Sequence, residues 1–137
     1  MGEQIRTLVD GVSAAWNRHD AQGFAAQFSD NGVLRVIATG DVVRGREHLG
    51  AVAEAYLRAF PDLQMERRST YDCETVCVIE STLKATHEGK FMGIPPTQRS
   101  VELLTCSIFT LGADGFLDEE TVYFDVATLL HQLGELP

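Results

Sequence analysis

Apolar residues recur at helical spacing in two segments of the chain. Residues 5–16 carry an apolar stripe at steps of three and four: Ile5, Leu8, Val9, Val12, Ala15 and Trp16. Residues 46–60 repeat the spacing through Leu49, Val52, Ala53, Tyr56, Leu57 and Phe60, and Pro61 ends that helix. Between them, Asp20 is a suitable N-cap for a short helix that carries Phe24 and Phe28. The pattern therefore predicts three helices in the first 60 residues.

Alternating apolar and polar residues predict strands elsewhere. Residues 33–38 are rich in β-branched side chains, and the chain returns through Val42 and Val43. Residues 75–87 alternate most clearly and place these side chains on one face: Cys77, Ile79, Ser81, Leu83, Ala85 and His87. Strands at 101–111 and 116–125, joined by a turn, precede a short helical tail. The order predicts an α+β domain with helices on one face of a curved antiparallel sheet.

Composition narrows the class of protein. The 137 residues, 45% hydrophobic and 23% charged, fit a single domain over residues 1–137. A net charge of -9 with scattered arginines argues against a nucleic-acid or anionic-membrane partner. Three cysteines cannot all pair within one chain, and no basic-then-apolar leader follows Met1. We therefore expect a reduced, cytoplasmic protein.

The cysteines do not predict a metal site. Cys73 and Cys77 lie four residues apart in what we interpret as one strand, where they would be roughly 13 Å apart. A zinc ion could not bridge them without a sharp bend. No histidine or other base adjoins Cys73, Cys77 or Cys106 in sequence, so a nucleophilic cysteine is also disfavoured.

Asp125 is the best candidate for chemistry. It follows a strand-like run at 121–124 and precedes the apolar segment 126–134. A carboxylate among aromatic and aliphatic side chains loses hydration, which raises its pKa and suits it to proton transfer near neutral pH. The alternative is a structural one, since an aspartate in this position can also cap the following helix.

A second informative stretch is the glycine- and proline-fixed turn at 86–97. His87 lies at its start, on the apolar face of the preceding strand, and large apolar side chains follow it. His87 is either a group in a pocket or a core histidine that stabilises the turn. Together with Asp125, this stretch predicts an apolar pocket with very few polar groups.

Four motifs resemble one family across almost the whole chain. They are Ala15-Trp16-Asn17-Arg18-His19-Asp20, Arg44-Gly45-Arg46-Glu47, Thr86-His87-Glu88-Gly89-Lys90-Phe91-Met92-Gly93-Ile94-Pro95-Pro96-Thr97, and Tyr123-Phe124-Asp125 leading to Gln132-Leu133-Gly134. In this order they resemble the SnoaL-like polyketide cyclases (ester cyclases) of the NTF2-like superfamily. The proline turn, combined with the late aspartate and the final Gln-Leu-Gly, is the most specific part.

The resemblance implies an NTF2-like (cystatin-like) cone, in which N-terminal helices close a strongly curved sheet around a hydrophobic cavity. It also implies an intramolecular aldol closure, or a related isomerisation, without metal or organic cofactor. The late aspartate would act as general acid and base, so we predict Asp125 and His87 as catalytic residues. The residues predicted to line the substrate pocket are Trp16, Phe28, Arg35, Tyr56, Phe60, Met92, Ile94 and Tyr123.

Two departures from the family leave other functions open. Cyclases place further polar side chains, including a histidine, around the aspartate, whereas the strand after the proline turn offers only Thr105, Cys106 and Ser107. Arg35 stands where a smaller polar group is expected. An inward Arg35 would fit an epoxide hydrolase or dehydratase in which an aspartate activates water; an outward one would be a charge partner on the sheet. The third alternative is a non-catalytic small-molecule-binding or dimerisation module.

We also expect a homodimer. The open outer face of such a sheet is commonly covered by a second copy. The side chains expected on that face are Val76, Val78, Glu80, Thr82 and Lys84, a mixed surface suited to a polar-rimmed interface.

Overall fold

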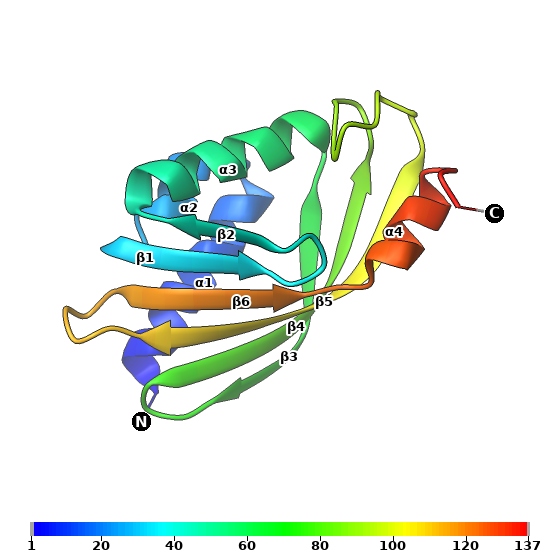
Figure 1. Ribbon diagram of the computed structural model, residues 1–137. Helices are drawn as coiled ribbons and strands as arrows, with labels where there is room; N and C mark the ends of the chain where they lie inside the picture. Colours follow the sequence, from blue (N-terminus) through cyan, green and yellow to red (C-terminus); the bar gives the residue numbers. More distant parts are fainter. Residues whose placement is uncertain (1, 137) are drawn as a thin grey trace.

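The computed structural model describes residues 2–136, which form four helices and six strands (Figure 1). In chain order these are α1 (Glu3–Asn17), α2 (Ala21–Ala25), β1 (Phe28–Val36), β2 (Asp41–Arg44), α3 (Arg46–Ala59), β3 (Gln64–Asp72), β4 (Val76–Thr86), β5 (Ser100–Leu111), β6 (Leu117–Tyr123) and α4 (Val126–Gln132). The predicted helices and the four longer predicted strands are confirmed, with boundaries moved by a few residues. Strand β3 was not predicted.

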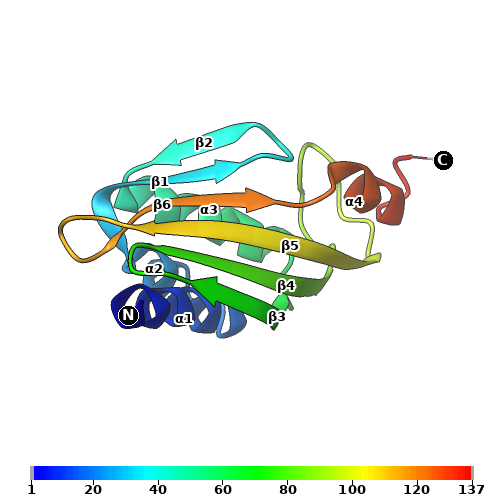
Figure 2. The ribbon, with the colours of Figure 1, turned by 90° about the horizontal axis from the view of Figure 1, so that it is seen from below.

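The six strands form one mixed sheet in the order β2-β1-β6-β5-β4-β3. The expectation of a wholly antiparallel sheet is wrong at one pair, because β1 runs parallel to its neighbour β6. A parallel pair needs a long connection, and here α3 and four strands separate β1 from β6 in the chain. Helices α1, α2 and α3 lie on the same face of the sheet (Figure 2).

Strand β3 was missed because its side chains are mostly polar, as is common at a sheet edge. Even a side chain that faces α1 is polar here: the Arg67 guanidinium donates to Asp10 at 2.6 Å and to the Ser13 hydroxyl at 2.7 Å. Cys73 then falls in the turn after β3, and Cys77 lies in β4. The interpretation of both cysteines as members of one strand is therefore wrong. All three cysteines are free thiols.

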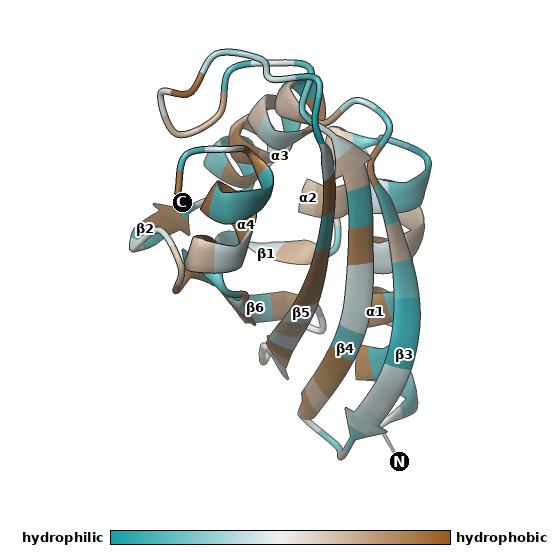
Figure 3. Ribbon diagram, turned by 90° about the vertical axis from the view of Figure 1, so that its right-hand side faces the viewer, coloured by the Kyte–Doolittle hydropathy of each residue, from teal (hydrophilic) through white to brown (hydrophobic). Residues whose placement is uncertain are grey.

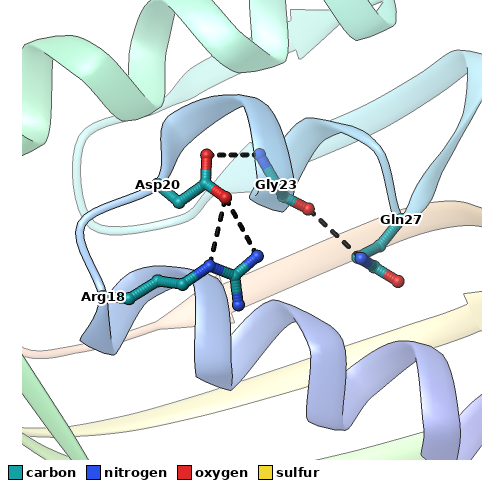
Figure 4. Close-up of polar contacts among 4 residues, drawn as sticks. All are labelled: Arg18, Asp20, Gly23 and Gln27. Atoms are coloured by element: carbon teal, nitrogen blue, oxygen red, sulfur yellow. Dashed lines mark hydrogen bonds and ion pairs between the residues drawn. The ribbon is translucent and has the colours of Figure 1, made fainter.

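The predicted cap of the second helix is confirmed (Figure 4). Asp20 accepts a hydrogen bond from the Gly23 backbone N–H at 2.9 Å, and Arg18 holds the other carboxylate oxygen at 2.9 Å. The helix is shorter than predicted, so Phe28 begins β1 instead of extending α2. Phe28 is fully buried, with its ring centroid 5.1 Å from that of Phe24.

Strong curvature shapes the space beneath the helices. Figure 3 shows β3, β4 and β5 bending away from β1 and β6, with α4 beside the end of the sheet. Two apolar clusters fill the concave side, one under α1 to α3 and one toward α4. Trp16, Leu57 and Phe124 contact both clusters. The predicted cone is confirmed, and its cavity lies where the clusters meet.

Candidate functional site

The cavity lies between the inner face of the sheet and the helices and has a volume of about 110 Å³. Its wall is almost entirely apolar, and among the described residues the polar side chains that line it are few: Tyr56, Thr105, Ser107 and Glu120, with the indole of Trp16. The prediction of an apolar pocket with very few polar groups is confirmed.

Aromatic side chains form a continuous arc along the cavity wall. The ring centroids of Phe24 and Trp16 are 5.0 Å apart, and those of Trp16 and Tyr56 are 6.4 Å apart. Tyr56 follows with Phe91 at 5.8 Å, and Phe91 packs edge-on against Phe60 at 5.2 Å. All five rings line the cavity. Helices α1, α2 and α3 supply Trp16, Phe24 and Tyr56, so the helical face makes the aromatic side of the site.

Glu120 on β6 is the carboxylate of the cavity. Its side chain is buried, with the residue only 6% exposed, and its Oε1 has no hydrogen-bond partner within residues 2–136. Burial raises the pKa of the Glu120 carboxyl to about 7, although a hydrogen bond from Ser107 acts in the opposite direction. At neutral pH this group can therefore both take up and release a proton.

A register shift in β6 explains why sequence reasoning missed Glu120. Leu111 pairs with Leu117, but Thr110 pairs with Glu119, so Asp118 is an extra residue in β6. Counting in steps of two from buried Leu117 would turn Tyr123 and Asp125 inward. The bulge reverses that parity, so Glu120, Val122 and Phe124 face the cavity instead. The spacing Glu120-x-Val122-x-Phe124 was the available signal.

Tyr56 is the second polar group of interest. Its hydroxyl has no hydrogen-bond partner in the part of the chain that the structure describes. Burial, followed by the negative charges of Asp41 and Glu120, raises the pKa of the Tyr56 phenol to about 12. The hydroxyl therefore stays protonated at neutral pH and is available as a hydrogen-bond donor near Glu120.

Asp125 lies outside the cavity, at the N-terminus of α4. One carboxylate oxygen accepts from the Ala127 backbone N–H at 3.1 Å, and the other accepts from the Thr128 hydroxyl at 2.6 Å. The expectation that burial raises its pKa is wrong: the side chain is exposed, and the bond from Thr128 lowers the pKa of Asp125. The observed geometry is that of the helix cap. A catalytic role for Asp125 stays a prediction.

His87 is fully buried behind the cavity wall. Its Nδ1 accepts the Thr97 backbone N–H at 3.2 Å, so in the neutral ring Nε2 carries the proton. The ring packs on Phe60, with centroids 5.6 Å apart, and Nε2 has no partner among residues 2–136. These contacts tie together the two ends of the loop that carries Phe91. His87 does not line the cavity, and its predicted catalytic role is untested.

The other predicted pocket residues divide into two groups. Trp16, Tyr56 and Phe60 line the cavity. The remaining five do not: Phe28 and Ile94 are buried in the two core clusters, Met92 is 47% exposed on its loop, Tyr123 is 43% exposed, and Arg35 pairs with Glu119 at 2.6 Å. Arg35 alternates with Leu34 and Val36, which line the cavity, so it faces away from it. The arginine-assisted epoxide hydrolase or dehydratase thereby loses the feature that favoured it.

The burial of Glu120 makes stability depend on pH. The pKa is raised from 4.5 to about 7, so the folded state holds this proton more tightly than the unfolded chain. The resulting stabilisation is fully present below pH 4.5 and is lost as pH rises through about 7. Between pH 4.5 and about 7, the free energy of unfolding of the wild type should fall by on the order of 3 kcal/mol relative to that of the Glu120→Gln variant. Urea unfolding of both proteins from acid to neutral pH checks this, and parallel curves would contradict it.

Neither a cluster of metal-binding side chains nor a membrane-spanning helix is found among residues 2–136. Residues 2–136 contain no group of three or more histidine, cysteine or acidic side chains able to hold a metal ion. None of the helices within that range is long and apolar enough to cross a bilayer.

The fold and the site define a class: a small α+β domain that closes an apolar cavity around one buried carboxylate. The profile of the SnoaL-like polyketide cyclase family matches residues 6–133, so the chain belongs to that family. No curated protein sequence matches the chain.

Solved structures share the fold. AclR from Streptomyces galilaeus, a proposed hydroxylase, is similar over 100% of both chains, with 31% identity and a TM-score of 0.85. A proposed SnoaL-like polyketide cyclase from Jannaschia sp. CCS1 has 19% identity and a TM-score of 0.87, over 98% of this chain and 94% of that one. A ketosteroid isomerase-like protein from Catenulispora acidiphila, solved with trimethylamine, has 16% identity and a TM-score of 0.81, over 95% and 93% of the two chains. The fold is NTF2-like.

Proposed function

We propose that this protein is a cyclase-type enzyme in which Glu120 removes a proton next to a carbonyl group of an apolar substrate. The observation that carries this is the buried carboxylate of Glu120 in an apolar cavity, with a pKa of about 7 and with Oε1 free of any hydrogen-bond partner among residues 2–136. A general base works best when its pKa lies near the working pH, because enough of it is ionised and the proton is still held. Glu120 thus takes the role that the sequence predicted for Asp125.

Tyr56 and Glu120 together support an intramolecular aldol closure. The Glu120 carboxylate takes the proton from carbon, and the Tyr56 hydroxyl donates a hydrogen bond to the enolate oxygen that forms. The enolate carbon then attacks a second carbonyl of the same molecule. The new alkoxide takes the proton from the Glu120 carboxylic acid, which restores the base. A wall that holds both carbons together can supply roughly 7–11 kcal/mol of the barrier reduction.

Hydroxylation is the second candidate, and the likeness to AclR over the full chain favours it. An enolate formed by Glu120 is electron-rich at carbon and can form a carbon–oxygen bond with dioxygen, which gives a hydroperoxide. An external two-electron reductant, such as a thiol, would then split the O–O bond and leave one oxygen as the hydroxyl group while the other departs as water. The product separates the two candidates by mass spectrometry. Ring closure keeps the mass or loses water, whereas hydroxylation adds one oxygen atom. A non-catalytic binding module of the same fold would give no product.

Proton abstraction is tested without knowledge of the natural substrate. Apolar 1,3-diketones and β-keto esters are incubated with the protein in deuterium oxide, and loss of the α-hydrogen signal is followed by NMR. The proposal expects exchange faster than the buffer rate, rising with pH as Glu120 ionises. Exchange at the buffer rate across a panel that demonstrably binds would contradict it.

We also propose a homodimer formed through the outer face of the sheet, in a reducing, cytoplasmic compartment that suits three free thiols. Leu104 is 69% exposed there, next to Tyr123, which pairs with Cys106 across β5 and β6. Thr82, expected on this surface, is instead covered, with its hydroxyl accepting from Arg68 at 3.2 Å.

The dimer proposal predicts the effect of one outer-face charge. Leu104→Arg should weaken self-association at least about tenfold, because a cation would be buried without a partner at the interface. Light scattering after size exclusion measures the mass. Met92→Arg, on an exposed loop away from this face, is the matched control. A wild type that is monomeric at high concentration would refute the proposal.

A further inference from the structure

Among the described residues, the charged side chains that line the cavity are acidic and none is basic. Glu120 is the only acid that lines it, and no lysine, arginine or histidine within residues 2–136 does so. The carboxylate oxygen Oε1 is buried and has no partner among these residues. The chain as a whole carries a net charge of -9, so its field attracts cations to the cavity mouth. An ionised Glu120 is therefore a buried negative charge without a counter-charge.

The aromatic arc borders the same space as Glu120. Tyr56 belongs to the arc, and the charge of Glu120 acts on its hydroxyl. The faces of aromatic rings carry negative electrostatic potential and attract a cation within about 6 Å of the ring centre. Trp16 and Tyr56, the two strongest rings for this purpose, are neighbours at 6.4 Å.

We propose that the cavity binds small organic cations bearing a tertiary or quaternary ammonium group, held between the Glu120 carboxylate and the arc Phe24, Trp16, Tyr56, Phe91 and Phe60. This goes beyond the proposed reaction and does not depend on it, since it requires only the charge of Glu120 and the rings. A polyketide-binding pocket without a charged group would not bind such cations.

The polar groups of the cavity select alkylated ammonium over a primary one. A primary ammonium brings three N–H donors that each need an acceptor, whereas the wall of the cavity is almost entirely apolar. A quaternary ammonium needs no acceptor, is weakly hydrated, and presents methyl groups to the apolar wall. Its positive charge stabilises the ionised form of Glu120, so binding at neutral pH displaces a proton.

The experiment compares choline with 3,3-dimethylbutan-1-ol, which has the same shape but a neutral carbon in place of nitrogen. Trp16 is the single tryptophan of the chain and lines the cavity, so its fluorescence reports binding. Choline affinity should rise at least about tenfold from pH 5 to pH 8 as Glu120 ionises, while the alcohol affinity stays constant. At pH 8 choline should bind at least about tenfold more tightly than the alcohol.

Three variants make the outcome decisive. Glu120→Gln should abolish both the preference for choline and its pH dependence. Glu119→Gln, the adjacent residue bound to Arg35 on the outer face, should keep both. Tyr56→Phe keeps the ring and should bind choline within about twofold of the wild type while proton exchange falls, which separates this inference from the proposed reaction. Equal affinity for the two ligands at pH 8, no fluorescence response to choline, or a preference that survives Glu120→Gln would each overturn it.

Discussion

Replacing Glu120 with glutamine is expected to lower proton abstraction by roughly 10²–10⁴-fold, the range that a positioned general base contributes. Glutamine has nearly the same shape and keeps a carbonyl oxygen able to accept the bond from Ser107, so the cavity should remain intact. The loss should therefore appear in kcat, with substrate affinity little changed. In the wild type, the rate should rise with pH through about 7, the pKa of the Glu120 carboxyl, and then level off.

Two substitutions of Asp125 test whether Asp125 or Glu120 is the general base. Asp125→Asn keeps a helix cap, and we expect turnover within about twofold of the wild type, because the side chain is exposed outside the cavity. Asp125→Ala removes the bonds to Ala127 and Thr128 and should cost about 0.5–2 kcal/mol of stability. If Asp125→Asn abolished turnover and Glu120→Gln did not, the assignment to Glu120 would be wrong and the sequence-based prediction right.

The largest effect on stability is expected for Phe28→Ala. Phe28 was predicted to line the pocket, but it is 0% exposed in the core, against Phe24. Removing a fully buried ring leaves a void and costs about 3–5 kcal/mol. For a domain of this size the midpoint of thermal unfolding should fall by roughly 10–20 °C.

Met92→Ala is the control for Phe28→Ala. Both residues were predicted to line the pocket, but Met92 is 47% exposed on its loop. Its truncation should change the free energy of unfolding by no more than about 0.5 kcal/mol. Chemical denaturation of both variants beside the wild type measures the difference. A small effect of Phe28→Ala would mean that its ring faces a space that can collapse or fill with ligand.

The position of the turn at 86–97 depends both on its local sequence and on a tertiary contact with α3. Its glycine and proline content predicted a fixed loop after β4. Only the structure shows why: a side chain at Gly89 would collide with the backbone carbonyl of Arg58, so the loop touches the end of α3. The Glu88 backbone N–H donates to Ala59 at 2.9 Å in the same place. This contact holds Phe91 against Tyr56 and Phe60 and completes the aromatic arc.

The sequence by itself determined the helices, most strands, the family and the apolar character of the cavity, because periodic burial and glycine-proline turns are local signals. The tertiary structure alone decided which carboxylate enters the cavity. One extra residue in β6, set by pairing with β5, reverses the alternation and turns Glu120 inward. A shift of one residue exchanges the two faces of a strand. Asp125 is left at the end of the sheet, where the free N–H groups of α4 are its natural partners.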